Sequence, residues 1–246
     1  MSEWVGKRYW LIGASEGLGR ALAHKLSKMG VEVIVSARSE DRLKELVADL
    51  PGKASYQVVD VTDSASVSEA AEAIGQIDGM VYLAGVYWPM AATDWKAEDA
   101  QMTVDVNFGG AMRAVGAVLP QMTTRDAGHI VLTGSLSGFR GLPEAAAYGS
   151  TKAAVMHLAE SLYCDLRSSG VKVQIANPGF IKTRLTDKNT FTMPFIMEPE
   201  EAARAMVELM MSDRFKRSFP GFFASFFRFS QFLPDFLYYR LFSSKG

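Results

Sequence analysis

Residues 7–19 read K-R-Y-W-L-I-G-A-S-E-G-L-G, and this stretch decides the fold. Residues 7–12 predict a strand, and leucines and alanines at helical spacing from residue 18 onward predict a helix. Three glycines, Gly13, Gly17 and Gly19, join the two elements. Glycine lets the backbone come close to a pyrophosphate, and the amide groups at the start of a helix attract negative charge. The stretch therefore predicts a strand, a glycine turn and a helix that together bind a phosphate group.

The glycine spacing here is G-x-x-x-G-x-G, which differs from the G-x-G-x-x-G fingerprint. Taken alone, such a triplet fits an ordinary turn with close helix packing equally well. Its position between a strand and a helix favours the phosphate site.

Strands and helices are predicted to alternate along the rest of the chain. The expected strands are residues 31–36, 55–59, 77–83, 129–133 and 171–176, and the expected helices are residues 39–50, 64–74, 97–123, 145–169 and 198–211. This order predicts an α/β fold with a parallel sheet covered by helices on both faces, and with ligands beyond the carboxyl ends of the strands. Without internal repeats or a linker, residues 1–246 are expected to form a single domain, with residues 213–246 as its aromatic C-terminal extension.

The end of the second strand carries a basic residue. Arg38 follows the glycine turn by about twenty residues, where an acidic side chain in NAD-binding folds takes the ribose 2′-hydroxyl and an arginine accommodates a 2′-phosphate. The tripeptide Ser36-Ala37-Arg38 contains no acid, which favours NADP(H) over NAD(H). The alternative is a solvated arginine that precedes a helix.

A second informative stretch is S-L-S-G-F-R-G-L-P-E-A-A-A-Y-G-S-T-K, residues 135–152. Tyr148 and Lys152 are four residues apart, so on a helix they share a face and can converge on one ligand. The pKa of tyrosine, about 10, is too high for acid–base work at neutral pH unless a nearby cation such as Lys152 favours the phenolate. Ser135, at a strand end, could donate to a substrate oxygen where negative charge develops. The alternative is a capping serine with a surface tyrosine and lysine.

Composition excludes several classes of protein. The chain has 26 basic and 27 acidic residues and a net charge of −1, so no positive field attracts nucleic acid, and a small or apolar partner is expected. One cysteine, Cys164, excludes an internal disulfide and is expected to be a buried, reduced thiol. The N-terminus lacks a signal sequence and no run of 18 apolar residues occurs, so a cytoplasmic location is expected.

Aromatic segments surround the predicted site. Residues 86–90 (V-Y-W-P-M) fit a pocket wall or a core flap, and residues 185–197 have no clean period and fit a flap over an apolar substrate. In the tail, the spacing of Phe222, Phe226, Phe229 and Leu233 predicts one apolar helix face, with Ser225, Arg228 and Gln231 largely opposite it. Three roles remain open for this tail: packing onto the body or a second subunit, covering the substrate pocket, or lying in a membrane interface.

Together these features resemble the short-chain dehydrogenase/reductase family from the first strand to about residue 211. The motifs in that family's order and spacing are Gly13, Gly17, Gly19, Asp60, Ala84-Gly85, Asn107, Ser135, Tyr148, Lys152, Pro178-Gly179 and Thr183. Each motif is weak alone, but their coincidence is specific. The resemblance implies a three-layer, doubly wound Rossmann-type fold with about seven parallel strands.

The resemblance also implies roles for individual residues. By analogy Tyr148 transfers the proton, Ser135 orients the substrate oxygen, Lys152 also holds the nicotinamide ribose, and Asn107 positions a water in a proton relay. The cofactor-binding set it implies is Gly13, Ser15, Glu16, Gly17, Leu18, Gly19, Arg38, Asp60, Val61, Ala84, Gly85, Asn107, Tyr148, Lys152, Pro178, Gly179, Ile181 and Thr183. It implies no metal.

Three features depart from the family pattern. Ile12 replaces the usual threonine before the first glycine, and Leu83 replaces the asparagine of the Asn-Ala-Gly motif. Both changes affect local hydrogen bonding around the cofactor more than the chemistry. The aromatic tail replaces a glycine-rich final strand segment common in tetrameric members, so the expected homo-oligomer is a dimer or a tetramer.

The sequence thus predicts an NADP(H)-dependent oxidoreductase that interconverts a carbonyl and an alcohol, with an apolar or lipid-like small-molecule substrate. The alternative is a cofactor-binding regulatory or scaffold protein that docks through its aromatic tail, with peripheral membrane contact as one form of docking. An intact set of Asn107, Ser135, Tyr148 and Lys152 counts against a pure binder.

Overall fold

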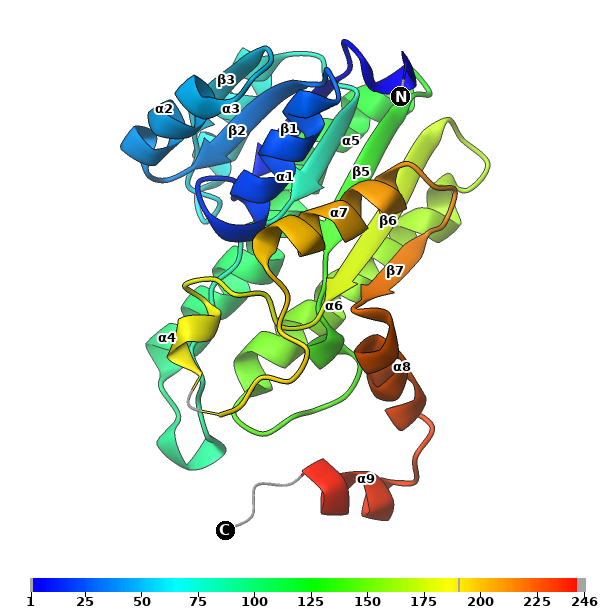
Figure 1. Cartoon of the computed structure of the whole chain (residues 1–246). Helices are drawn as coiled ribbons and strands as arrows, with labels where there is room; N and C mark the ends of the chain where they lie inside the picture. The colour runs from blue at the N-terminus through cyan, green and yellow to red at the C-terminus, as the bar shows by residue number, and fades with distance from the viewer. Residues whose placement is uncertain (1, 190, 243–246) are drawn as a thin grey trace.

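The computed structural model describes residues 2–189 and 191–242 and contains a seven-stranded sheet in the order β3-β2-β1-β4-β5-β6-β7. Every pairing between neighbouring strands is parallel. The strands are β1 (Arg8–Ile12), β2 (Glu32–Ala37), β3 (Ala54–Val58), β4 (Gly79–Tyr82), β5 (Gly128–Thr133), β6 (Val171–Pro178) and β7 (Lys216–Phe219). The parallel sheet of an α/β fold, predicted from the alternating pattern, is therefore confirmed, as is the seven-stranded sheet that the family resemblance implies. The carboxyl ends of the strands lie at one edge of the sheet (Figure 1).

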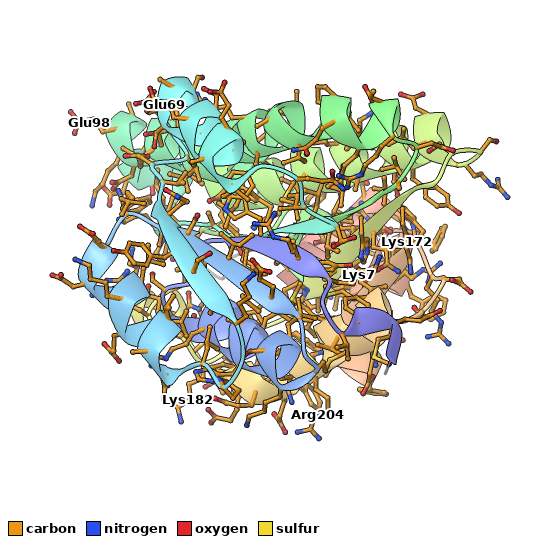
Figure 2. All side chains as sticks on the ribbon, turned by 90° about the horizontal axis from the view of Figure 1, so that it is seen from above. Lys7, Glu69, Glu98, Lys172, Lys182 and Arg204 are labelled. Carbon is orange, nitrogen blue, oxygen red and sulfur yellow. The ribbon has the colours of Figure 1, made fainter. Side chains whose placement is uncertain are left out.

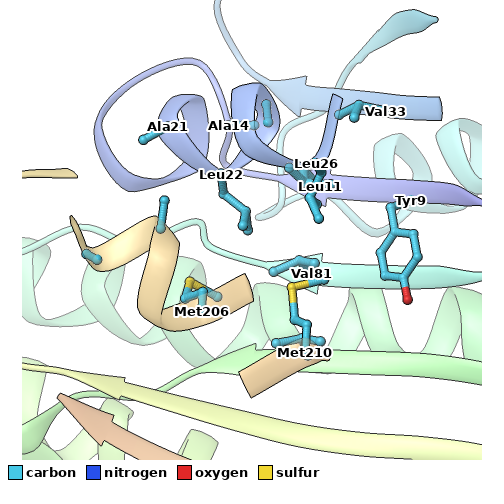
Figure 3. Packing of buried hydrophobic residues seen from close by; sticks show 14 of the residues in the cluster. Tyr9, Leu11, Ala14, Ala21, Leu22, Leu26, Val33, Val81, Met206 and Met210 are labelled. Atoms are coloured by element: carbon cyan, nitrogen blue, oxygen red, sulfur yellow. The ribbon is translucent and has the colours of Figure 1, made fainter. Parts of the chain in front are cut away.

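Helices cover both faces of this sheet, which gives three layers (Figure 2). One face carries α1 (Gly17–Lys28), α2 (Glu40–Asp49) and α7 (Pro199–Met210), and the other carries α3 (Ser64–Ile74), α5 (Gly110–Thr124) and α6 (Ala146–Leu166). Leu22 and Leu26 of α1 and Met206 of α7 belong to one buried apolar cluster on this face of the sheet (Figure 3). Each of these three side chains is fully buried. The burial of their apolar surface stabilises the packing of α1 against α7, and α1 begins in the glycine turn.

The seventh strand was not identified from the hydrophobic pattern. β7 has the sequence K-R-S-F, and only Phe219 is fully buried, because an edge strand pairs on one side alone. Its register aligns Lys216 with Ile175 and Phe219 with Pro178. The segment assigned to the aromatic extension thus also supplies the last strand of the sheet.

The tail forms two short helices, α8 (Gly221–Ser230) and α9 (Asp235–Phe242), at the end of the molecule toward which the strands point (Figure 1). The predicted apolar stripe does not form the packed face. Phe222, Phe226 and Phe229 are 81%, 51% and 69% exposed, whereas Phe223 and Phe227 are buried. The sequence pattern could not distinguish these faces, because both carry phenylalanine and α8 ends before Leu233.

The buried face of the tail packs against the loop that follows β5. Phe223, Ala224 and Phe227 form an apolar cluster with Leu136. The Arg140 guanidinium donates to the carbonyl oxygens of Ser230 (3.0 Å) and Leu233 (2.7 Å), pairs with the Asp235 carboxylate, and lies 3.9 Å from the centre of the Tyr238 ring. Gln231 and Tyr238 donate to the carbonyl oxygens of Phe139 and Gly141. The tail is therefore attached to residues 136–141.

Two further sequence expectations concern the burial of Cys164 and the presence of membrane-spanning helices. Cys164 is exposed rather than buried, because it lies on the side of α6 that faces away from the sheet, beside the exposed Ser161 and Asp165. No helix among the described residues is long and apolar enough to cross a membrane.

A substitution at Gly13 tests how much the close contact between the glycine turn and the residues after β4 contributes to stability. It has φ +91°, and an added Cβ would lie 2.3 Å from the backbone nitrogen of Ala84. We expect Gly13→Ala to lower the free energy of unfolding by roughly 2–4 kcal/mol, through backbone strain and overpacking. The measurement is urea denaturation followed by circular dichroism.

The matched control is Gly116→Ala, since an added Cβ on Gly116 of α5 would meet no atom within 4 Å. That change should be neutral or stabilising by about 1 kcal/mol. Equal loss of stability in the two variants would contradict the steric explanation.

Candidate active site

The glycine turn meets two other predicted segments at the carboxyl edge of the sheet. The positions that a Cβ would take on Gly13 and Gly17 lie 2.3 Å from the backbone of Ala84 and 2.8 Å from the Thr183 side chain. On Gly19 a Cβ would lie 2.3 Å from the carbonyl oxygen of Gly13. Because each contact leaves room only for hydrogen, the turn stays close to β4 and to the segment after β6. A phosphate-binding cradle of this kind needs the glycines that occupy it.

Glu16 makes two ion pairs beside the glycine turn, and Leu18 makes apolar contacts. Glu16 immediately precedes α1, and its carboxylate pairs with Arg42 of α2 (2.9 Å) and with Arg184 (2.6 Å). Ser15 is partly exposed in the turn, and Leu18 packs against the core below it. Glu16 therefore connects the turn to the segment that follows β6.

The ends of β2 and β3 bring Arg38 and Asp60 to the same side of the site. The Arg38 side chain is exposed and makes no hydrogen bond or ion pair with the described residues. Asp60 accepts hydrogen bonds from the amide (2.9 Å) and hydroxyl (2.7 Å) of Thr62. Burial opposes ionisation of Asp60, but the Thr62 hydrogen bonds and the Arg38 charge hold its pKa below the usual value. Val61 is buried beneath them, and its carbonyl oxygen accepts from Arg113.

Asn107 lies where the predicted single helix 97–123 is interrupted. The structure has α4 (Ala97–Val104), a π-helical segment (Asp105–Gly109) and then α5. The buried Asn107 amide accepts from the Val86 amide (2.8 Å) and donates to the Val86 carbonyl oxygen (3.0 Å) and the Thr151 hydroxyl (3.2 Å). Such a wide turn frequently marks a functional site. It also satisfies the buried asparagine and fixes the loop after β4.

Ser135, Tyr148 and Lys152 come together as the sequence predicts. Ser135 follows β5, and its Oγ accepts from the amide (3.2 Å) and hydroxyl (3.0 Å) of Ser137. Lys152 is buried on α6, and its Nζ donates to the Thr133 carbonyl oxygen (3.0 Å) and lies 5.6 Å from the centre of the Tyr148 ring. A Cβ on Gly85 would lie 3.5 Å from Asn107 Oδ1 and 3.8 Å from Lys152 Nζ, so the end of β4 joins this group.

The electrostatics of this group differ from the sequence expectation. Burial raises the pKa of Tyr148 to about 12, against a hydrogen bond with Ser135, and the Tyr87 phenol adds to the rise. Burial also lowers the pKa of Lys152 to about 8. Lys152 alone therefore does not bring the pKa of the phenol near neutrality, because burial disfavours the charged forms of both groups.

Residues 179–183, which follow β6, form the remaining side of the candidate site. Gly179 donates its amide to the Phe219 carbonyl oxygen at 2.8 Å, which ties the Pro178-Gly179 turn to β7. Ile181 is buried and pairs with Met197. Thr183 donates its amide to Thr186 Oγ1 (3.0 Å), and its carbonyl oxygen accepts from the amides of Thr186 (2.9 Å) and Asp187 (3.1 Å). These contacts hold Thr183 against Gly17.

Several contributors were not identified from the sequence. The Tyr87 ring contacts the Tyr148 ring with centroids 4.9 Å apart, and Lys188 donates to the Tyr87 carbonyl oxygen (2.8 Å) and lies over the Trp88 ring. Residues 86–90 were expected to form a pocket wall or a core flap. Their contact with Tyr148 could not be predicted, because a contact between residues so far apart in sequence leaves no periodic pattern. Thr133 acts through its carbonyl oxygen, which any residue type supplies.

The residues present fit a dinucleotide. The glycine turn leaves a cradle that a Cβ would fill, an exposed arginine follows β2, and a buried lysine and a tyrosine lie beyond Gly85. Among the described residues, no group of three or more His, Cys, Asp or Glu side chains is placed to hold a metal ion.

Comparisons with known proteins agree with this geometry. The model of the short chain dehydrogenase family matches residues 7–193. An uncharacterized oxidoreductase of Myxococcus xanthus (strain DK1622) is 38% identical over 242 residues, which cover 96% of each chain. The structure of a short-chain dehydrogenase from Streptomyces avermitilis has a TM-score of 0.82 and 27% identity, covering 90% of this chain and 91% of that one. A closed form of serine dehydrogenase complexed with NADP+ has a TM-score of 0.79 and 25% identity, covering 86% and 93%.

The lowered pKa of Lys152 predicts a pH dependence of stability. The folded chain releases the Lys152 proton near pH 8 and the unfolded chain near pH 10.5, so between these values the unfolded chain binds more protons and stability rises with pH. From pH 7 to pH 10 we expect the wild type to gain about 2 kcal/mol relative to Lys152→Met. The measurement is urea denaturation of both proteins at each pH, and parallel stability curves would contradict the prediction.

Proposed function

The chain belongs to the short-chain dehydrogenase/reductase family of oxidoreductases, and we propose that it interconverts a carbonyl and an alcohol with Tyr148 as the proton-transferring group. The observation that carries the proposal is the convergence of Tyr148, Ser135 and the buried Lys152 beside the glycine turn. A coincidence of surface residues would not bury the ammonium, because burying a charge costs several kcal/mol unless a function or partner offsets it.

Each side chain has a defined task in this proposal. Ser135 Oγ accepts two hydrogen bonds from Ser137, and its own O–H, which is hydrogen-bonded to Tyr148, is the donor that would turn to the substrate oxygen. The Tyr148 hydroxyl gives its proton to that oxygen during reduction and takes it back during oxidation. Lys152 holds a positive charge near the phenol, and Asn107 fixes the loop that borders it and positions a relay water.

The groups for the cofactor lie along the same edge. Bound NADP(H) supplies the hydride for reduction and accepts it in oxidation. The glycine turn receives the pyrophosphate, and Lys152 together with Tyr148 holds the nicotinamide ribose. The other residues proposed to contact the cofactor are Ser15, Glu16, Leu18, Asp60, Val61, Ala84, Gly85, Pro178, Gly179, Ile181 and Thr183.

We propose NADP(H) rather than NAD(H) as the cofactor. The exposed Arg38 guanidinium lies at the end of β2 and keeps its hydrogen-bond donors available, whereas the nearby Arg42 is paired with Glu16. A 2′-phosphate would accept charge-assisted hydrogen bonds from Arg38. The structurally similar serine dehydrogenase is one that was solved as a complex with NADP+, which is consistent with this choice.

An apolar or lipid-like substrate fits the surroundings of Ser135. Leu136 directly after it packs with Phe223 and Phe227, and Phe180 extends this cluster. The flap, residues 185–197, adds Phe191, whose ring centroid is 5.8 Å from that of Phe180. These apolar side chains favour a hydrocarbon-rich carbonyl compound over a charged one.

We further propose a homo-oligomer, dimer or tetramer, that works in the cytoplasm. Exposed apolar side chains at Met102, Val104 and Met112 on α4 and α5 support an interface between copies. A second candidate function, docking as a cofactor-binding scaffold, is supported by the exposed Phe222 and Phe229 on α8. The two functions are compatible in one protein.

Removal of the phenol tests the proposed chemistry. With NADPH and a panel of apolar ketones, Tyr148→Phe should lower kcat/KM by about 10²–10⁴-fold, because proton transfer is lost. NADPH binding by fluorescence titration should weaken by less than about tenfold, because only one hydrogen bond to the ribose is lost. The control is Tyr163→Phe, whose ring lies on the same helix and stacks on Phe215 instead. A wild type without turnover on the whole panel, or an equally active Tyr148→Phe, would overturn the proposal.

Removal of the guanidinium tests the cofactor preference. Arg38→Leu should raise the KM for NADPH about 10- to 100-fold, because charge-assisted hydrogen bonds contribute roughly 1.5–3 kcal/mol, and should leave the KM for NADH unchanged. Arg20→Leu is the matched control, since Arg20 pairs with Asp49 on α2. If NADPH and NADH were affected equally, Arg38 would not select the phosphate.

A further inference from the structure

The tail presents a group of exposed aromatic and aliphatic side chains that the proposed chemistry does not use. We define the tail surface as Phe222, Phe226 and Phe229 of α8, Phe232 in the turn, and Phe236 and Leu241 of α9, whose exposed fractions run from 51% to 81%. Exposed side chains of this size that cluster on a soluble protein mark an interaction site. The tail surface also lies outside residues 7–193, which match the family model.

Ring contacts join the two tail helices to each other and to the flap. Phe226 of α8 contacts Phe242 of α9 with centroids 5.8 Å apart. Phe195 of the flap, itself 57% exposed, contacts Phe222 at 6.1 Å. The tail surface is therefore continuous with the flap, and it lies at the end of the molecule that holds the carboxyl ends of the strands (Figure 1).

The charges around the tail surface select its partner. Residues 221–242, which carry the tail surface, contain two arginines and one aspartate. Arg228 and Arg240 are exposed and form no ion pair with the described residues, whereas Asp235 is paired with Arg140. Two copies docked through this face would bring like charges together. An anionic lipid surface instead complements the arginines and accepts aromatic rings at the headgroup level.

We propose that the tail surface docks on a membrane containing anionic phospholipid, with Arg228 and Arg240 at the headgroups and the phenylalanines inserted between them. Arginine suits this position because its long side chain reaches the headgroups while the neighbouring rings lie deeper. Docking places the flap against the bilayer, so an apolar substrate could enter from the lipid. This last consequence rests on the proposed function, but the docking itself does not.

The test uses sedimentation of the full chain with vesicles of phosphatidylcholine alone, and with about one third phosphatidylglycerol. The wild type should sediment with the anionic vesicles and less so at high salt, since screening weakens surface charge interactions. The triple variant Phe229→Ser, Phe232→Ser, Phe236→Ser should bind them roughly tenfold or more weakly, because apolar burial is lost. The double variant Val5→Ser, Val58→Ser changes exposed apolar residues elsewhere and should bind like the wild type.

The other outcomes would overturn docking on a membrane. They are a wild type that stays in solution with both vesicle types, or a triple variant that binds as well as the wild type. A wild-type oligomer that dissociates in the triple variant, with no vesicle binding by either, would assign the tail surface to a second copy. NADPH oxidation with a water-soluble ketone, which we expect to be equal in all three proteins, reports separately on the proposed function.

Discussion

The close contact between the glycine turn and the end of β4 is the constraint on which the site depends. At Gly13 only a hydrogen fits against the backbone of Ala84, and the next residue, Gly85, borders Asn107 and Lys152. The backbone itself therefore sets the spacing between the proposed phosphate-binding end and the proposed proton-transferring end of the site. Interiors packed this tightly transmit small displacements, so a side chain at the turn would shift the whole edge of the sheet.

Burial is the second determinant of the chemistry, and it acts on two groups in opposite directions. It raises the pKa of Tyr148 and lowers that of Lys152, so both are biased toward their neutral forms. A neutral phenol is suited to giving a proton to a carbonyl oxygen. In the proposed chemistry the unliganded site is thereby prepared for reduction, and taking a proton from an alcohol requires further positive charge close to the ring.

The sequence predicted six of the seven strands and the convergence of Ser135, Tyr148 and Lys152. These features depend on local patterns: apolar runs, glycine spacing and the helical offset from Tyr148 to Lys152. It missed features set by tertiary contacts. The π-helical segment at Asn107 exists because that amide bonds to Val86, and β7 forms because an edge is available beside β6. The buried face of α8 was also mistaken, since phenylalanine occupies both faces and only the contact with Leu136 distinguishes them.

The attachment of the tail has a thermodynamic consequence. Arg140, which holds Ser230, Leu233 and Asp235, lies in the loop that connects Ser135 to Tyr148. Suppose that a partner at the tail and a ligand in the site both favour the same arrangement of this loop. Each of them then raises the binding affinity of the other, and by the same factor.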